Sequence, residues 1–195
     1  MTPTVAEFLA RWEAAGGVGW YVGPDERLGD RLAEAWQRWV PSDEDAVAAL
    51  WLPEELDRPE RLLPWIAAVR AVRWEPGQDP TAYRQAAAAA AMGVTGALAA
   101  VAETGSVLLA LGPTTPLLPS LLPPIHVAVI PTDRVVATLS EAFHRLYRAA
   151  AAAGWPPVAK FVTGPSMTAD IEGQLVVGVH GPRVAVAIVC EEPLA

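Results

Sequence analysis

Two short polar segments carry the side chains that could do chemistry. The segment 103–106 begins with Glu103, an isolated charge in a long uncharged stretch, and the segment 163–172 follows an apolar strand predicted for 158–162. Chemistry in α/β proteins collects at the carboxyl ends of strands, because backbone N–H groups and polar side chains converge there. Clustered carboxylates raise the pKa of one of their number, which makes it a general acid or base, or they attract a cation. The candidate catalytic residues are therefore Glu103, Asp170 and Glu172.

Small and polar residues around these carboxylates could bind a substrate. Hydroxyls, imidazoles and glycine N–H groups all offer hydrogen bonds, and an imidazole titrates near neutral pH. We expect the segments 103–106 and 163–172 to converge on one face of a sheet, since each lies at a strand–turn or strand–helix junction. The predicted substrate-binding residues are Thr104, Gly105, Ser106, His126, Gly164, Ser166, Thr168 and His180.

Each of these features also has a structural interpretation. Turn amides could satisfy the Glu103 carboxylate, or solvent could. Ser166 or Thr168 could be the N-cap of a helix whose first turn holds the acidic residues. A histidine at a strand end is commonly a hydrogen-bonded structural residue. No HExxH pair is present, so we predict no metal site, and the dinucleotide, P-loop and serine-hydrolase signatures are absent.

Composition narrows the classes of partner and cofactor. The 195 residues are 52% hydrophobic and 18% charged, with a net charge of −8, which argues against nucleic acid or an anionic membrane as the partner. The single cysteine, Cys190, cannot hold a cysteine-ligated iron–sulfur cluster or zinc ion by itself, and it fits a reducing cytoplasm. Residues 1–15 show no secretory signal. The apolar run 106–131 contains six prolines, which forbid a membrane-spanning helix.

Periodicity predicts an α/β fold in a single domain, 1–195. Residues 1–80 are acidic and Trp-rich and are expected to add helices and edge strands to a core formed by 81–195. Gly105 is expected to form the turn between two buried strands. Buried strands that alternate with helices imply a mostly parallel sheet covered on both faces. The expected strands are 18–22, 69–74, 94–102, 107–111, 125–130, 158–162 and 184–189, and the stretch 46–52 fits a strand or a helix equally well. The expected helices are one capped by Thr4 that ends at Gly16, 26–40, 80–92 and one from Thr132 to Gly154.

Five blocks of the sequence, in order, resemble the LUD-domain family, in particular its lactate-utilisation protein C (LutC/YkgG) type. They are GVTG at 93–96, AETGS at 102–106, SLLPPIH at 120–126, TGPSMTADIE at 163–172 and GVHGP at 178–182. The resemblance covers about residues 80–190. It implies a three-layer α/β/α fold similar to the NagB/RpiA/CoA transferase-like superfamily.

The resemblance also implies a function. It suggests a cytoplasmic component of a bacterial system that oxidises L-lactate to pyruvate, acting with iron–sulfur partner proteins and carrying no cluster or other cofactor itself. A homo-oligomer is compatible with the sequence. The alternatives are a stand-alone enzyme or a sensor that binds a small phosphorylated, CoA-linked or carboxylate metabolite. Two departures from the family pattern weaken an anion clamp: Met167 replaces a usually basic residue, and residues 116–118 replace a segment that often contains arginine.

Overall fold

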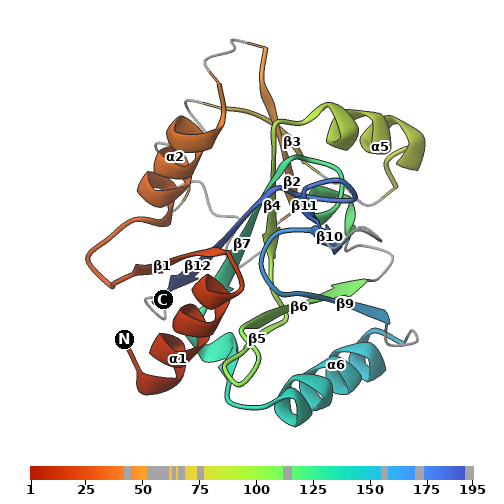
Figure 1. The fold of residues 1–195 in the computed structure, drawn as a ribbon. Helices are drawn as coiled ribbons and strands as arrows, with labels where there is room; N and C mark the ends of the chain where they lie inside the picture. The colour runs from red at the N-terminus through yellow and green to blue at the C-terminus, as the bar shows by residue number, and fades with distance from the viewer. Residues whose placement is uncertain are drawn as a thin grey trace.

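The computed structural model describes residues 1–41, 45–51, 62, 65, 69–73, 77–111, 116–154, 158–169 and 174–191. Labels follow Figure 1. The helices are α1 (Pro3–Ala14), α2 (Leu28–Trp39), α5 (Pro80–Ala89) and α6 (Leu139–Ala153), with 3-10 turns η1 (Leu118–Ser120) and η2 (Thr132–Arg134). The strands are β1 (Val18–Val22), β2 (Val47–Trp51), β3 (Arg70–Arg73), β4 (Met92–Gly96), β5 (Ala99–Val101), β6 (Ser106–Leu111), β7 (Ile125–Pro131), β8 (Val135–Val136), β9 (Val158–Val162), β10 (Met167–Ala169), β11 (Leu175–Val177) and β12 (Val184–Cys190).

The centre of the molecule is a six-stranded parallel sheet in the order β1-β12-β7-β4-β2-β3. Its central strands are almost wholly apolar and buried, as expected for a parallel sheet that is covered on both faces. The α/β class and the mostly parallel sheet predicted from the sequence are confirmed. Within the described residues no helix is both long enough and apolar enough to span a bilayer.

One face of this sheet packs against α2. Alternate sheet residues such as Val94, Val127 and Ile188 share a core with Leu32 and Ala35 of the helix. The apolar side chains of the helix lie on one face, and packing this face on the sheet removes it from water.

The opposite face is covered by α1 and α5. Ala128 and Val189 of the sheet pack with Phe8 and Trp12 of α1, and Ala49 packs with α5 towards the β3 edge. Because side chains alternate across a strand, these residues face away from α2. Figure 1 shows α2 and α1 near the edge of the sheet formed by β1, and α5 near the opposite edge, beside β2 and β3.

A second sheet, in the order β8-β5-β6-β9, was not predicted from the sequence. The stretch expected as one strand over 94–102 is divided between β4 of the main sheet and β5 of the second sheet. The second sheet packs on α6 through Val101, Leu108 and Leu146, and its other face joins the core of α1. As predicted, Gly105 forms the β5–β6 turn, with a φ of +63° that L-residues rarely adopt.

The expected helix from Thr132 begins later than predicted. Val135 and Val136 form β8, which pairs in parallel with β5, and α6 starts at Leu139 with Thr138 as its N-cap. Valine is β-branched and favours strands. Hydrogen bonding to the free edge of β5 therefore stabilises a strand here, although the spacing of apolar residues fits a helix. The end of the helix at Gly154 is confirmed.

The segment after β9 forms a hairpin instead of starting a helix. Thr168 lies in β10, which pairs in antiparallel fashion with β11, so the N-cap interpretation of Ser166 and Thr168 is wrong. The described residues of both hairpin strands are exposed, including Leu175 at 63% and Val176 at 45%.

Candidate functional site

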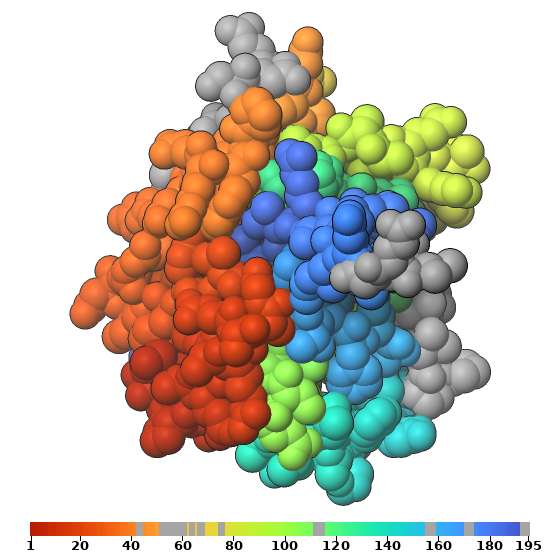
Figure 2. Space-filling model, in the orientation of Figure 1, coloured from red at the N-terminus to blue at the C-terminus, as the bar shows by residue number. Residues whose placement is uncertain are grey.

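A cavity of about 290 Å³ lies between the main sheet and the second sheet. Figure 2 shows one surface of the molecule. On it, residues of the β9–β10 region, in blue, lie against those of α1, in red. The lining residues are Ser120, Leu121, His126, Lys160, Phe161, Val162, Thr163, Gly164, Pro165, Ser166, Met167, His180, Gly181, Pro182 and Ala185.

The cavity lies at the amino ends of the central parallel strands. His126 is the second residue of β7 and Ala185 the second of β12, and the two are paired in register. Only β9, in the second sheet, reaches the cavity with its carboxyl end, at Val162 and Thr163. The expectation that the site lies at strand carboxyl ends therefore holds for β9 but not for the main sheet.

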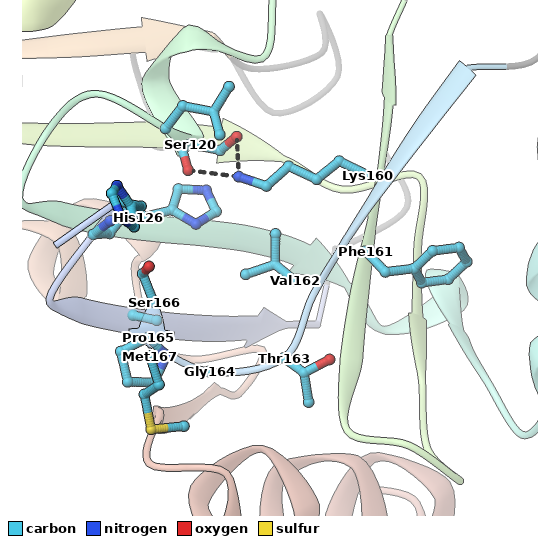
Figure 3. Close-up of a pocket in the computed structure, with 15 residues that line it drawn as sticks. Ser120, His126, Lys160, Phe161, Val162, Thr163, Gly164, Pro165, Ser166 and Met167 are labelled. Carbon is cyan, nitrogen blue, oxygen red and sulfur yellow. Dashed lines mark hydrogen bonds between the residues drawn. The ribbon is translucent and has the colours of Figure 1, made fainter. Parts of the chain in front are cut away.

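Lys160 is the only lysine of the chain; the other basic residues are all arginines. Figure 3 shows its side chain reaching from β9 towards Ser120, while its neighbour Phe161 points the opposite way. The ammonium Nζ donates to the Ser120 carbonyl at 2.9 Å and to Ser120 Oγ at 3.4 Å. Burial lowers the pKa of Lys160 to about 8. A cation is therefore held in a desolvated site without a carboxylate among its hydrogen-bond partners in the described part of the chain.

Ser120 reaches the cavity because a glycine lies beneath it. A Cβ on Gly93 of β4 would lie 1.8 Å from the Pro119 carbonyl oxygen, so only glycine allows η1 to rest on the sheet at this point. Gly93 is paired in register with His126. The Ser120 hydroxyl donates to the Leu117 carbonyl at 2.7 Å, which leaves its oxygen to accept from Lys160.

His126 is 1% exposed and lies beside Lys160 (Figure 3). Its Nε2 is 2.8 Å from Thr95 Oγ1, whereas its Nδ1 is buried and has no hydrogen-bond partner within the described residues. Burial, and secondarily the charge of Lys160, lower the pKa of His126 to about 3. The imidazole is consequently neutral at physiological pH, and one of its ring nitrogens has no hydrogen-bond partner among the described residues.

Two loops close the remaining sides of the cavity. The Ser166 N–H donates to the Pro182 carbonyl at 2.9 Å, and the Gly178 N–H donates to the Ser166 carbonyl at 2.8 Å. Thr163 is bonded through its hydroxyl to Ser106 Oγ at 2.7 Å. These contacts tie the TGPS and GVHGP blocks together at the base of the β10–β11 hairpin.

The Glu103 turn lies outside the cavity. The Glu103 carboxylate accepts the backbone N–H of Leu139, the first residue of α6. This geometry matches the interpretation in which backbone amides satisfy the carboxylate, with an acidic group at a helix N-terminus. Thr104 Oγ1 is buried without a hydrogen-bond partner among the described residues, and Gly105 packs against Arg11 and Trp12 of α1.

The predicted site residues thus divide into groups. His126, Gly164, Ser166 and His180 line the cavity. Ser106 stands one hydrogen bond behind the lining, whereas Glu103, Thr104 and Gly105 lie in the turn beside α1 and α6 and Thr168 is exposed on the hairpin. Asp170 and Glu172 lie outside the described residues, so the predicted convergence of the three carboxylates stays a prediction.

Sequence reasoning missed Lys160, Ser120 and Thr95. A signal for Lys160 was available: a lone lysine in an otherwise apolar strand indicates a cation that is at least partly buried. Ser120 and Thr95 come from separate segments that only the fold brings together. The described residues include no group of three or more His, Cys, Asp or Glu side chains placed to hold a metal ion.

Fold and site together define a class: an α/β protein with a small cavity that is lined by its single lysine and a neutral imidazole. The chain belongs to the LUD-domain family, whose model matches residues 6–190. The resemblance noted in the sequence is confirmed, and the match includes the Trp-rich first 80 residues, where no motif was apparent.

Several curated proteins are moderately similar to the chain in sequence. Lactate utilization protein C of Halalkalibacterium halodurans is 41% identical over 102 residues, covering 52% of this chain and 44% of that protein. The protein of the same name from Exiguobacterium sp. is 35% identical over 133 residues, covering 67% and 58% respectively. The chain spans about half the length of the curated relatives it matches.

A solved structure supports the fold. The crystal structure of a DUF162 family protein from Deinococcus radiodurans aligns with a TM-score of 0.65 and covers 96% of each chain. At 22% sequence identity, this likeness shows the fold alone.

Proposed function

We propose that the chain is a cytoplasmic, non-redox component of a bacterial L-lactate utilisation system that oxidises L-lactate to pyruvate, and that it works with iron–sulfur partner proteins. The observation that carries the proposal is the likeness to relatives named Lactate utilization protein C, at 35–41% identity in the two proteins described above, within a family match over residues 6–190. The cavity supports it, because it is small and offers a cation to a small organic acid.

The cysteine count supports the assignment of iron–sulfur clusters to partners. Cys190 is the one thiol of the chain and is 4% exposed in the sheet core. Its Sγ lies 3.7 Å from the Ile130 carbonyl oxygen. A cluster held by cysteines needs several thiolates, which this chain does not supply.

Asp170 and Glu172 remain candidate catalytic residues. They immediately follow β10, whose base is joined to the cavity through Ser166. We expect Asp170→Asn to impair lactate-dependent growth while the melting temperature stays nearly unchanged, with Glu172→Gln as the matched variant on the same segment. Full complementation by both variants at normal protein levels would remove these residues from the site.

A second candidate is a stand-alone enzyme or sensor for a small carboxylate metabolite. The observation that favours it is the cavity itself, which is formed within one chain and needs no partner residue for its lysine and imidazole. In this case the chain would bind a metabolite without affecting growth on lactate.

Gene deletion followed by a pull-down tests the proposal. We expect a deletion strain of the source organism to grow normally on pyruvate but poorly on L-lactate, and the wild-type gene to restore growth. Tagged full-length chain should co-purify cysteine-rich proteins that contain iron and sulfide. Normal growth of the deletion strain on L-lactate, with no iron-containing protein recovered, would contradict the proposal and favour the second candidate.

A further inference from the structure

We propose that the cavity is a binding site for a small monocarboxylate with an oxygen at C2, a 2-hydroxy or 2-oxo acid, whose carboxylate pairs with Lys160 and whose C2 oxygen meets His126 Nδ1. The inference rests on the proposed function for the choice of acid, because lactate and pyruvate belong to this class. The anion site itself rests on the geometry and the burial of Lys160 and His126.

The charge of the lining sets the charge of the ligand. Lys160 is the only lysine or arginine among the lining residues that the structure describes. His126 is neutral at physiological pH, and His180 is exposed at the rim. One half-buried cation balances one negative charge, whereas a phosphate dianion would leave a second charge uncompensated in a partly desolvated site. A monoanion is therefore favoured over a phosphate.

Lys160 needs such a counter-ion. Its present partners are two neutral oxygens of Ser120, and burial works against its charged form. A carboxylate at Nζ would supply the missing opposite charge and stabilise the protonated amine further, since a charge-assisted hydrogen bond is stronger than a neutral one. Ligand binding should consequently make the amine less reactive towards electrophiles.

His126 provides a second, independent indication of a ligand. A buried imidazole nitrogen without a partner is unusual, because buried polar groups are almost always hydrogen-bonded. If Thr95 Oγ1 donates to Nε2, Nδ1 carries the proton and can donate to a 2-oxo group. If Nε2 donates to Thr95, Nδ1 can accept from a 2-hydroxyl. In either form the ring distinguishes these acids from acetate.

The volume of the site agrees with this class of ligand. A cavity of about 290 Å³ lies at the lower limit of small-molecule sites. The two loops that line it pack closely, since a Cβ on Gly181 would lie 3.1 Å from the Ser166 Cβ.

Titration of the purified full chain tests the proposal, with L-lactate, pyruvate, acetate and inorganic phosphate as probes and calorimetry as the readout. We expect lactate or pyruvate to bind saturably and more tightly than acetate or phosphate. Lys160→Met should weaken this binding by at least about tenfold, the effect of losing a charge-assisted hydrogen bond. His126→Gln keeps a group that can reach Thr95 but removes Nδ1, so it should reduce the preference over acetate. Arg148→Met, an exposed cation on α6, is the matched control and should bind as wild type does.

Acetylation of Lys160 gives a second readout, since mass spectrometry of a chain with one lysine reports that amine directly. Lactate or pyruvate should slow the reaction, and sodium chloride at equal ionic strength should not. Absence of saturable binding, equal binding by Lys160→Met, or tighter binding of phosphate would overturn the proposal. A borohydride-reduced pyruvate adduct on Lys160 would also overturn it, by making the amine a nucleophile rather than an ion-pair partner. The proposed function fails separately, through the growth of the deletion strain.

Discussion

At the scale of single residues, Lys160 dominates the electrostatics of the site. Arginine supplies every other side chain of the protein that carries a full positive charge at neutral pH. Lysine differs from arginine in being a compact charge that can lose its proton when buried. The lowered pKa of Lys160 therefore makes the stability of the fold depend on pH, and the proposed ligand binding should depend on pH as well.

Between about pH 8 and 10.5, the free energy of unfolding of the wild type should rise relative to that of Lys160→Met. The pKa of Lys160 falls from 10.5 to about 8 on folding, so between these values the unfolded chain binds more protons than the folded one, and raising the pH stabilises the fold. The raised pKa values of Tyr21 and Tyr83 act in the opposite direction, but only above the ordinary tyrosine value of 10.0. Urea midpoints at intervals between about pH 7.5 and 9.5 measure the effect. Parallel midpoints for wild type and variant across this range would show that Lys160 is not desolvated.

Substitution of Glu103 tests whether its carboxylate has a catalytic or a structural role. Because its oxygen accepts the Leu139 N–H at the start of α6, Glu103→Gln should cost about 1 kcal/mol of unfolding free energy through the weaker bond and the lost helix-dipole interaction. Growth on lactate should be unaffected. Loss of growth at unchanged stability would instead support the catalytic role predicted from the sequence.

At the scale of elements, much of the fold could be predicted because local patterns and tertiary structure agree. The strands at 18–22, 125–130, 158–162 and 184–189 were expected within one residue at either end. The failures have a common physical cause. β8, β5 and the β10–β11 hairpin are each only two or three residues long, so their identity depends on a neighbouring strand edge and not on local periodicity.

The candidate site was harder to predict than the fold. The TGPS and GVHGP blocks were found because polar residues and glycines stand out between apolar strands. No sequence pattern links η1 to β4, although the two are in contact. Ser120 lies over the sheet because Gly93 has no side chain to keep η1 away. Such a contact is set by packing, which a single sequence does not reveal.

Gly93→Ala tests this contact between elements. A Cβ 1.8 Å from the Pro119 carbonyl oxygen must displace η1, so we expect a loss of about 1–3 kcal/mol in unfolding free energy, as for other overpacked sites. Ligand binding at Lys160 should weaken as well, because Ser120 moves with η1.

Gly23→Ala is the matched control for Gly93→Ala. Its added Cβ would meet nothing closer than the Glu26 carboxylate at 3.8 Å, and its cost should stay within about 0.5 kcal/mol. Wild-type stability and binding in Gly93→Ala would mean that η1 does not rest on β4 as described.

At the scale of the whole molecule, the parallel sheet and the second sheet together enclose a cavity that neither forms alone. The main sheet supplies His126, which is hydrogen-bonded to Thr95, and the second sheet supplies Lys160. Between them stands α1, whose C-terminal end contacts the turn after β9: a Cβ on Gly164 would lie 2.4 Å from the Ala15 carbonyl oxygen. The acidic, Trp-rich N-terminal segment is thus part of the architecture that holds the site, which agrees with a family match beginning at residue 6.

The growth rate of a strain carrying Lys160→Met in place of the wild-type gene tests the central claim most directly. A system that uses this cavity in lactate utilisation requires the cation, so we predict slow growth on L-lactate, normal growth on pyruvate and wild-type levels of the variant protein. The Arg148→Met strain should grow as the wild type does on both. Wild-type growth of the Lys160→Met strain on L-lactate would contradict the claim that this family member acts through its one lysine.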